Sequence, residues 1–270
     1  MDLQLAGKVA VITGAGGAIC GEIAKAFASE GVCVAIWDVS FESACARRDE
    51  IRSAGGNALA VKCDATEKES VAFALKETLL EYGTVDILVN GAGGSRKETT
   101  TSDDLTFFDI DPEAMQAVLA LNYLSAVIPS QAIGRLFAEK QAGVILNISS
   151  VAGICPVTRA ISYSDGKAAT NSFTRWLAVH MVQHYSPNIR VNAIAPGFML
   201  TEQNRFLLID AATGALTARG QQVIENVPVR RYGKAHEVVG AALWVVSEHA
   251  SFVTGAVIPV DGGFTAFSGV

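Results

Sequence analysis

Tyr163 and Lys167 are the two residues whose types and spacing are best suited to chemistry. They lie four positions apart, and in a helix this spacing puts both side chains on one face, one turn apart. A phenol titrates near pH ~10, so it can accept a proton at neutral pH only if its phenolate is stabilised. The ammonium of Lys167 would supply that stabilisation, and we expect it, together with the positive charge of an oxidised nicotinamide, to lower the pKa of Tyr163. The pair therefore predicts proton transfer, although an ordinary surface pair on an amphipathic helix would have the same spacing.

A glycine-rich segment near the start of the chain has the form of a phosphate-binding turn. Residues 13–20 read TGAGGAIC and connect an apolar run to a segment with helical spacing. Gly14 permits a tight turn, Gly16 and Gly17 let the backbone approach a pyrophosphate, and the helix start offers free N–H groups. The segment predicts a dinucleotide site, although a purely structural glycine turn would look the same.

Asp38 ends the second apolar run, close to the spacing at which an acidic residue accepts hydrogen bonds from the adenosine ribose. A 2′-phosphate would be repelled by this carboxylate, and no arginine directly follows Asp38 to offset the repulsion. We therefore expect NAD(H) to be preferred over NADP(H). Asp38 could also cap the next helix, a role that is compatible with ribose binding.

The elements that must position these residues alternate along the chain. Short apolar runs that favour strands occupy 9–13, 32–37, 58–61, 87–89, 144–148, 189–193 and 256–260. Helical spacing occupies 22–30, 41–54, 67–82, 112–140, 163–185 and 235–248. This order predicts an α/β fold of the doubly wound Rossmann type, a parallel sheet of about seven strands with helices on both faces. We expect residues 1–270 to form a single NAD-binding and catalytic domain, with the irregular stretch 197–227 as a substrate lid.

Composition and charge argue against several classes of protein. The formal charge is −6 and no basic cluster exceeds two residues, which disfavours a nucleic-acid partner. Residues 1–8 do not resemble a targeting peptide, and we expect charged residues to interrupt every long apolar window, so we predict a cytoplasmic protein with no membrane partner. The five dispersed cysteines predict neither a disulfide nor a metal site. His180 and His184 lack the glutamate of a zinc hydrolase helix, and no nucleophile elbow surrounds Ser149 and Ser150.

Taken together, the motifs resemble the short-chain dehydrogenase/reductase family over essentially the whole chain. The matching pieces are Thr13-Gly14, Asp38, Asp64, the segment NGAG at 90–93, Asn122, Ser149-Ser150, YSDGK at 163–167, PGFMLT at 196–201 and VDGG at 260–263. The chain departs from the family's glycine pattern at Ala18 and Cys20, where we expect the added Cβ atoms to weaken cofactor binding.

The resemblance implies roles for named residues. The catalytic set it implies is Asn122, Ser150, Tyr163 and Lys167. Ser150 would bind the substrate oxygen, and Asn122 would order a water beside Lys167. The cofactor set it implies is Gly14, Gly16, Gly17, Ala18, Ile19, Asp38, Asp64, Ala65, Asn90, Gly91, Ala92, Tyr163, Lys167, Pro196, Gly197, Phe198 and Thr201. The bound nicotinamide would carry the hydride between an alcohol and a ketone.

Cationic residues near the expected pocket suggest the substrate class. Arg159 lies four residues before Tyr163, with Lys97 and Arg205 as second choices for binding a carboxylate. We therefore hypothesise a sugar acid, held also by Ser150, although each cation could be a solvated loop charge. Several stretches resemble the D-mannonate oxidoreductase (fructuronate reductase) branch of the family, which implies reduction of D-fructuronate to D-mannonate. Gluconate 5-dehydrogenase-like chemistry, another polyol or keto-acid reductase, and a non-enzymatic NAD(H) sensor or scaffold are the alternatives. The family also implies a homotetramer or homodimer.

Overall fold

The computed structural model describes residues 2–269 and contains one seven-stranded parallel sheet, in the order β3-β2-β1-β4-β5-β6-β7. The strands are β1 Val9–Thr13, β2 Cys33–Asp38, β3 Ala58–Lys62, β4 Ile87–Asn90, β5 Gly143–Ile148, β6 Ile189–Pro196 and β7 Val257–Val260. Every residue of β1, β4 and β6 is buried. Such strands need helices on both faces, which is why continuous apolar runs predict a parallel sheet.

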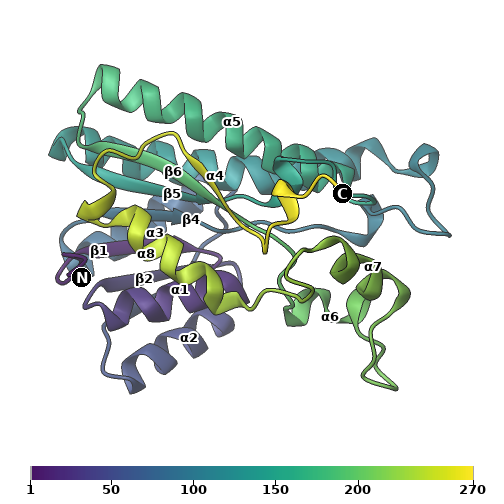
Figure 1. Cartoon of the computed structure of the whole chain (residues 1–270). Helices are drawn as coiled ribbons and strands as arrows, with labels where there is room; N and C mark the ends of the chain where they lie inside the picture. Colours follow the sequence, from purple (N-terminus) through teal and green to yellow (C-terminus); the bar gives the residue numbers. More distant parts are fainter. Residues whose placement is uncertain (1, 270) are drawn as a thin grey trace.

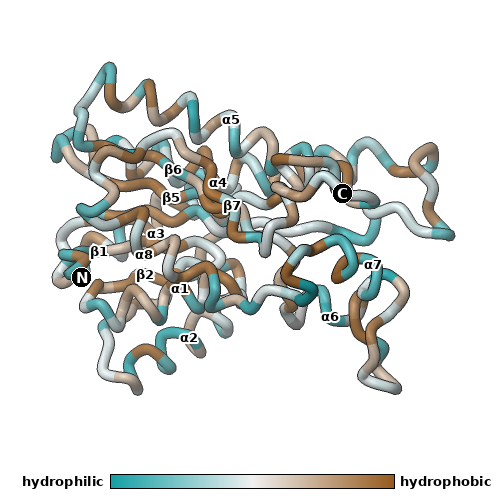
Figure 2. The backbone as a smooth tube through the Cα atoms, in the orientation of Figure 1, coloured by the Kyte–Doolittle hydropathy of each residue, from teal (hydrophilic) through white to brown (hydrophobic). Residues whose placement is uncertain are grey.

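Two layers of helices supply that cover. The α-helices are α1 Ala18–Ser29, α2 Phe41–Ser53, α3 Lys68–Tyr82, α4 Pro112–Lys140, α5 Ile161–His184, α6 Glu202–Leu208, α7 Ala218–Asn226 and α8 Val239–Val246. Helices α1, α2 and α8 pack on one face of the sheet and α3, α4 and α5 on the other (Figure 1). Neighbouring residues of a strand pack on opposite faces of the sheet. Ile12 lies in the hydrophobic core under α1, α2 and α8, and Val11 lies in the core under α3, α4 and α5. Figure 2 shows the hydrophobic residues gathered in the central strands. The predicted fold class is confirmed.

Helix α4 shows which local signals define an element from sequence alone. The Asp111 side chain accepts hydrogen bonds from the N–H groups of Glu113 and Ala114, and Pro112 occupies the first turn. The helix ends where Gln141 adopts a left-handed conformation at φ 59°. Both ends match the predicted 112–140. By contrast, the predicted helix 235–248 begins as a 3-10 helix, Ala235–Val238, and its α-helical part ends at Val246, before Ser247 becomes extended.

Helix α4 also corrects one expectation about charge. No charged residue occurs between Glu113 and Arg135, so charged residues do not interrupt every long apolar window. By length and composition this helix is the one described helix that could cross a membrane, and 50% of its apolar window is buried inside the protein. The packing of α4 against α5, α3 and the sheet accounts for that apolar composition.

The sequence suggested that the stretch 197–227 is irregular, and this expectation is wrong. It contains α6 and α7, joined by a short antiparallel bridge between Ile209 and Leu216. Near the start of the stretch, Met199 forms a parallel bridge with Gly233. Both helices are too short for hydrophobic periodicity to reveal them. The segment lies beyond the sheet at the right of Figure 1, and its role as a lid stays a prediction, as does the assignment of the chain to one domain.

The strand order reverses between β1 and β4, with β2 and β3 on one side and β5 to β7 on the other. In open parallel sheets, ligands bind at the carboxyl ends of the strands beside such a switch point. The glycine turn after β1 and the loop after β4 both lie there, next to each other, because β1 and β4 pair.

Candidate active site

Tyr163 and Lys167 both lie in the first two turns of α5. The Lys167 Nζ atom is 5.7 Å from the centre of the Tyr163 ring. Lys167 is only 5% exposed, and its Nζ donates a hydrogen bond of 2.9 Å to the carbonyl of Ile148 at the end of β5. A buried ammonium is costly. The structure therefore contradicts the surface-pair alternative for these two residues.

Burial shifts the pKa values of both residues of this pair. Burial lowers the pKa of Lys167 from 10.5 to about 8. Burial raises the pKa of Tyr163, while its hydrogen bond with Ser150 lowers it by less. In the protein without a nicotinamide the pKa of Tyr163 is raised, because desolvation of the phenol outweighs its hydrogen bond with Ser150. The lowering expected from Lys167 together with an oxidised nicotinamide stays a prediction.

Ser150, rather than Ser149, faces Tyr163. The Ser150 side chain is hydrogen-bonded to Tyr163 and also accepts from the N–H of Ala152, which caps the 3-10 helix Val151–Gly153. Ser149 turns into the protein, where its hydroxyl donates to the side chain of Asn171. The backbone at the end of β5 thus sends two consecutive serines to opposite sides, and Ser150 is the one beside the phenol.

Asn122 on α4 clamps the loop after β4. Its amide donates to the carbonyls of Gly94 at 2.7 Å and Val118 at 2.9 Å, and its oxygen accepts from the Gly94 N–H at 3.1 Å. A Cβ added to Gly93 would lie 2.7 Å from the Asn122 oxygen and 3.2 Å from the Lys167 Nζ. Asn122 and Lys167 therefore converge on Gly93, and the expected water relay between them stays a prediction.

The glycine turn after β1 fits a dinucleotide pyrophosphate. Gly14 has φ 67°, and a Cβ there would press against the backbone of Ala92 at 3.0 Å. Gly17 caps α1 without any side-chain hydrogen bond, so the first N–H groups of that helix keep no side-chain acceptor. A helix start of this kind binds anions. Gly16 donates its N–H to the Asp38 carboxylate at 2.9 Å, which fixes the acid beside the turn.

Ala18 and Cys20 deviate from the family pattern in different ways. Ala18 is exposed at the start of α1, close to where a pyrophosphate would lie. Cys20 is buried, and its sulfur fills the space above Gly91, where an added Cβ would lie 2.0 Å from it. Burial raises the pKa of the Cys20 thiol to about 12. The Cys20 side chain therefore packs inside the protein, and the weakening of cofactor binding expected from both residues stays a prediction.

The remaining cofactor positions fall along the same edge of the sheet, with one exception. The Asp64 carboxylate accepts from the N–H of Thr66 at 2.9 Å, and Ala65 next to it is buried. Gly91 and Ala92 give their N–H groups to the hydroxyl of Thr13. The exception is the Asn90 side chain, which is 3% exposed and bonds inward to Ser130 and Asn147. Any contact of Asn90 with a cofactor would come from its backbone.

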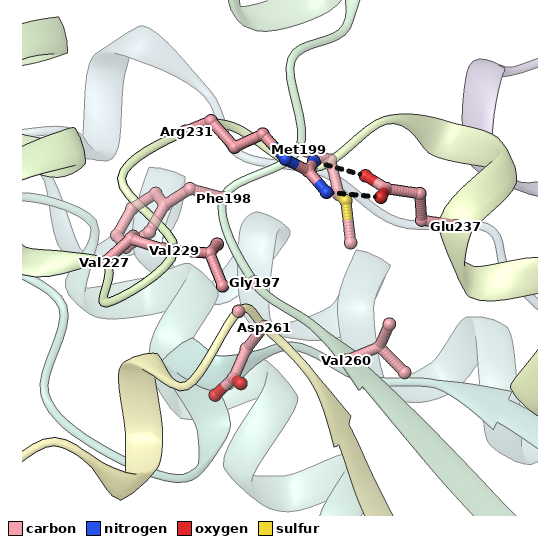
Figure 3. A pocket seen from close by; sticks show the side chains of 11 residues that line it. Gly197, Phe198, Met199, Val227, Val229, Arg231, Glu237, Val260 and Asp261 are labelled. Atoms are coloured by element: carbon pink, nitrogen blue, oxygen red, sulfur yellow. Dashed lines mark hydrogen bonds and ion pairs between the residues drawn. The ribbon is translucent and has the colours of Figure 1, made fainter.

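The Pro196-Gly197 turn ends β6 and leads into the predicted lid. Gly197 packs so closely on β7 that an added Cβ would lie 2.7 Å from the Asp261 Cα. Thr201 starts α6, where its N–H donates to Asn204 at 2.9 Å. Phe198, Arg231 and Glu237 line part of a cavity of about 120 Å³, with the Arg231–Glu237 ion pair at one side of it (Figure 3). This cavity is too small for a substrate and a dinucleotide, and it lies beside the bridge between Met199 and Gly233.

The predicted substrate cations are distributed around the mouth of the site. Arg159 lies in the exposed loop before α5, Lys97 in an exposed 3-10 helix, Lys97–Thr99, and Arg205 on the exposed side of α6. A further cation, Arg219, lies on α7. The positive charge of Arg159 lowers the pKa of Arg219, a shift to which burial contributes most.

Known proteins share this arrangement over nearly the whole chain. A family model described as enoyl-(acyl carrier protein) reductase matches residues 14–265. The "uncharacterized oxidoreductase UxuB" of Bacillus subtilis strain 168 is 40% identical over 276 residues, which cover 99% of this chain and 98% of that protein. The chain belongs to the short-chain dehydrogenase/reductase family. It is accordingly an oxidoreductase of that family.

Other short-chain dehydrogenases show how widely the relatives differ in substrate. A Haemophilus influenzae protein provisionally named D-mannonate oxidoreductase, solved with bound NAD, is 40% identical, has a TM-score of 0.92 and covers 98% of both chains. A Beutenbergia cavernae protein provisionally named gluconate 5-dehydrogenase, with NADP at low occupancy, is 30% identical with a TM-score of 0.86, covering 99% of this chain and 100% of that one. The 7alpha-hydroxysteroid dehydrogenase of Escherichia coli K12 is 35% identical over 97% of this chain and 96% of its own length. Bound NAD and NADP in these relatives support a nicotinamide cofactor for the family member described here.

Proposed function

We propose that this protein interconverts a sugar-acid alcohol and its ketone with NAD(H), in the direction of D-fructuronate to D-mannonate or its reverse. The observation that carries the proposal is the burial of Lys167 behind Tyr163, with Ser150 hydrogen-bonded to the phenol at the end of β5. An apolar residue in place of a buried cation is often neutral or stabilising, whereas proton transfer by a phenol is helped by a cation beside it, so the pair favours a catalytic role.

The proposed roles follow from the chemistry of each group. When bound, the nicotinamide accepts or supplies the hydride. Ser150 holds the substrate oxygen at the Tyr163 hydroxyl, which gives a proton to a ketone oxygen or takes one from an alcohol. Lys167 stabilises the phenolate through its charge. Gly14, Gly16 and Gly17 would hold the pyrophosphate, and Asp38 the ribose.

The proposed substrate rests on charge and on one relative. Arg159, with Lys97 or Arg205 as second choices, would bind a carboxylate at the mouth of the site. The Haemophilus influenzae relative is named for D-mannonate, which agrees with that class. Gluconate 5-dehydrogenase-like activity is the second candidate, because a relative of that name has the same fold.

The test is a panel of four reactions: oxidation of NADH and of NADPH with D-fructuronate, and reduction of NAD with D-mannonate and with D-gluconate. Turnover of D-fructuronate with NADH would support the proposal. Turnover of gluconate alone would favour the second candidate. If the protein binds NADH but turns over no sugar acid or polyol, and Tyr163→Phe changes no measured property, it is a sensor or scaffold instead.

Asp38→Ser should shift the cofactor preference. We expect NADPH to bind at least about tenfold more tightly and NADH more weakly, since the change removes the carboxylate that would repel a 2′-phosphate and bind ribose hydroxyls. Fluorescence titration with both cofactors measures the effect. Glu42→Gln is the matched control, because Glu42 is an exposed acid in the same region that makes no bond to the glycine turn. The alternative that Asp38 caps α2 is wrong, because Ser40 is the cap residue of that helix. Equal NADPH affinity in wild type and Asp38→Ser would show that Asp38 serves only to fix the glycine turn through its bond to Gly16.

We also propose that the protein forms a homotetramer or homodimer through α4, α5 and the last strand. Exposed apolar residues on these elements support this, among them Leu119 and Leu124 on α4 and Trp176 and Val179 on α5. The strand β7 is an edge of the sheet, where pairing with another copy is open. Light scattering at micromolar concentration should give at least twice the monomer mass, and a monomer mass would contradict the proposal. A cytoplasmic location stays a prediction.

A further inference from the structure

The segment 102–109, which we call the acidic loop, leads into α4 and exposes two aromatic side chains. It reads SDDLTFFD. Phe107 is 58% exposed and Phe108 is 90% exposed, and the centres of their rings are 5.6 Å apart. The backbone folds on itself here, because the N–H of Ser102 donates to the Leu105 carbonyl at 3.0 Å. Exposed aromatic side chains are typical of surfaces that bind another protein.

An apolar groove lies between α3 and α4, with a volume of about 650 Å³. Its apolar lining is formed by Val71, Leu75, Leu79, Ile128 and Ala132. The groove is open to solvent, and Leu80, which also lines it, is 72% exposed. Covering such a surface is favourable, because apolar area is then removed from water.

The acidic loop and the groove carry opposite charges. Lys68, Lys76 and Arg135 line the groove, and no acid does so among the residues that the structure describes. Within the same part of the chain, none of these three cations forms an ion pair. The acidic loop contains three aspartates and no cation. The two surfaces are therefore complementary in charge as well as in apolar character.

The acidic loop does not reach the groove of its own chain. It joins α4 at Asp111, whereas the groove begins on this helix at Ile128. A helix rises about 1.5 Å per residue, so roughly 26 Å of α4 separates the two. The other end of the loop is fixed, because the N–H of Thr101 donates to the Arg159 carbonyl at 3.0 Å. A second copy of the chain can supply the loop instead.

Two copies related by a two-fold axis would satisfy both surfaces at once. Their α4 helices would run antiparallel, so that the acidic loop at the start of each lies beside the groove near the end of the other. The midpoint between Phe108 and Ala132 falls at about residue 120, where the two helices would cross. Leu119 and Leu124 lie on either side of this point and are 39% and 38% exposed. The crossing point therefore has the apolar surface that a contact between helices requires.

We propose that the groove between α3 and α4 binds the acidic loop of a second copy of this chain. Phe107 and Phe108 would lie on the apolar lining, and the three aspartates would lie among the three cations. The proposal rests on the homodimer or homotetramer proposed above and specifies one of its contacts. Because the axis is two-fold, each copy gives one loop and receives one.

An exchange of charges tests this contact. One variant reverses the loop with Asp103→Lys and Asp104→Lys, and the other reverses the groove with Lys76→Glu and Arg135→Glu. All four side chains are exposed, so both variants should fold. Either variant by itself sets like charges against each other at both contacts. The dissociation constant of the assembly, from light scattering over a dilution series, should rise at least about a hundredfold. An equimolar mixture pairs opposite charges at both contacts, so it should recover the wild-type mass.

The aromatic part of the contact is tested by the double variant Phe107→Ser with Phe108→Ser. It should raise the same dissociation constant at least about tenfold, since two apolar anchors are lost. Phe73→Ser is the matched control, because Phe73 is 57% exposed on α3 but does not line the groove. Lys62→Glu is the control for charge, because Lys62 is an exposed cation of β3 outside the groove. Both controls should assemble as wild type does.

Three outcomes would overturn the proposed contact. The first is wild-type assembly by both charge-reversed variants, and the second is a mixture that does not recover the wild-type mass. The third is dissociation of the groove variant alone, which would mean that another segment or another protein occupies the groove. A monomeric wild type would overturn the contact together with the proposed assembly. None of these results bears on the proposed enzymatic reaction, which the panel of substrates tests separately.

Discussion

Tyr163→Phe should lower kcat for both directions of the reaction by about a thousandfold, within the range that a single proton-transferring group contributes. The substitution removes only the hydroxyl, so the ring, the backbone of α5 and the position of Lys167 should be kept. Affinity for NADH should change little, since the proposed cofactor contacts come mainly from the glycine turn and Asp38. Steady-state kinetics and NADH fluorescence titration together measure both parts.

Tyr123→Phe is the matched control for this substitution. Tyr123 lies on α4, one residue after Asn122, and its ring packs edge-on against Phe173 at 6.0 Å. We expect its removal of one hydroxyl to leave kcat within about twofold of wild type, as for surface changes away from the site. A loss of activity shared equally by both variants would mean that packing between α4 and α5, rather than the Tyr163 phenol, controls the rate.

Lys167→Met should abolish most activity and stabilise the fold at neutral pH. Burial lowers the pKa of Lys167 from 10.5 to about 8, so the charged form costs the folded state about 3 kcal/mol. Methionine removes this cost. It also leaves the carbonyl of Ile148 without its donor, and this loss destabilises the folded state by about 1–2 kcal/mol. A net gain of roughly 1–2 kcal/mol at pH 7 is therefore expected, and urea unfolding measures it.

The same substitution has a defined pH dependence. Below pH 8 the lysine is protonated in both the folded and the unfolded chain, so the full cost is present. Between pH 8 and 10.5 the folded protein releases the proton while the unfolded chain keeps it, so wild type becomes relatively more stable as pH rises. The advantage of Lys167→Met should therefore shrink between pH 7 and pH 9.5. An advantage that is constant over this range would mean that Lys167 is not buried as a cation.

The sequence by itself determined the scaffold and the chemistry that it presents. Continuous apolar runs such as that of β1 predicted buried parallel strands, because only strands covered on both faces exclude polar residues entirely. Asp111 and Pro112 defined the start of α4 through local hydrogen bonding. Tyr163 and Lys167 were found because a helix converts a spacing of four into one face. These are all local effects, because each depends on residues that are close together in the sequence.

Only the tertiary structure decided how the groups are charged and which of them meet. Burial of Lys167 against Ile148 depends on β5. Burial of the Tyr163 phenol raises its pKa, because the charged phenolate is desolvated. The Asn90 side chain turned out to bond inward, because alternate residues of a strand face opposite sides and its neighbours Ser130 and Asn147 lie on the inner one. Helices α6 and α7 were not expected, because they carry too few turns to show a periodic pattern. Contacts between segments far apart in the chain are set by the packing of whole elements, and no local pattern of residue types encodes them.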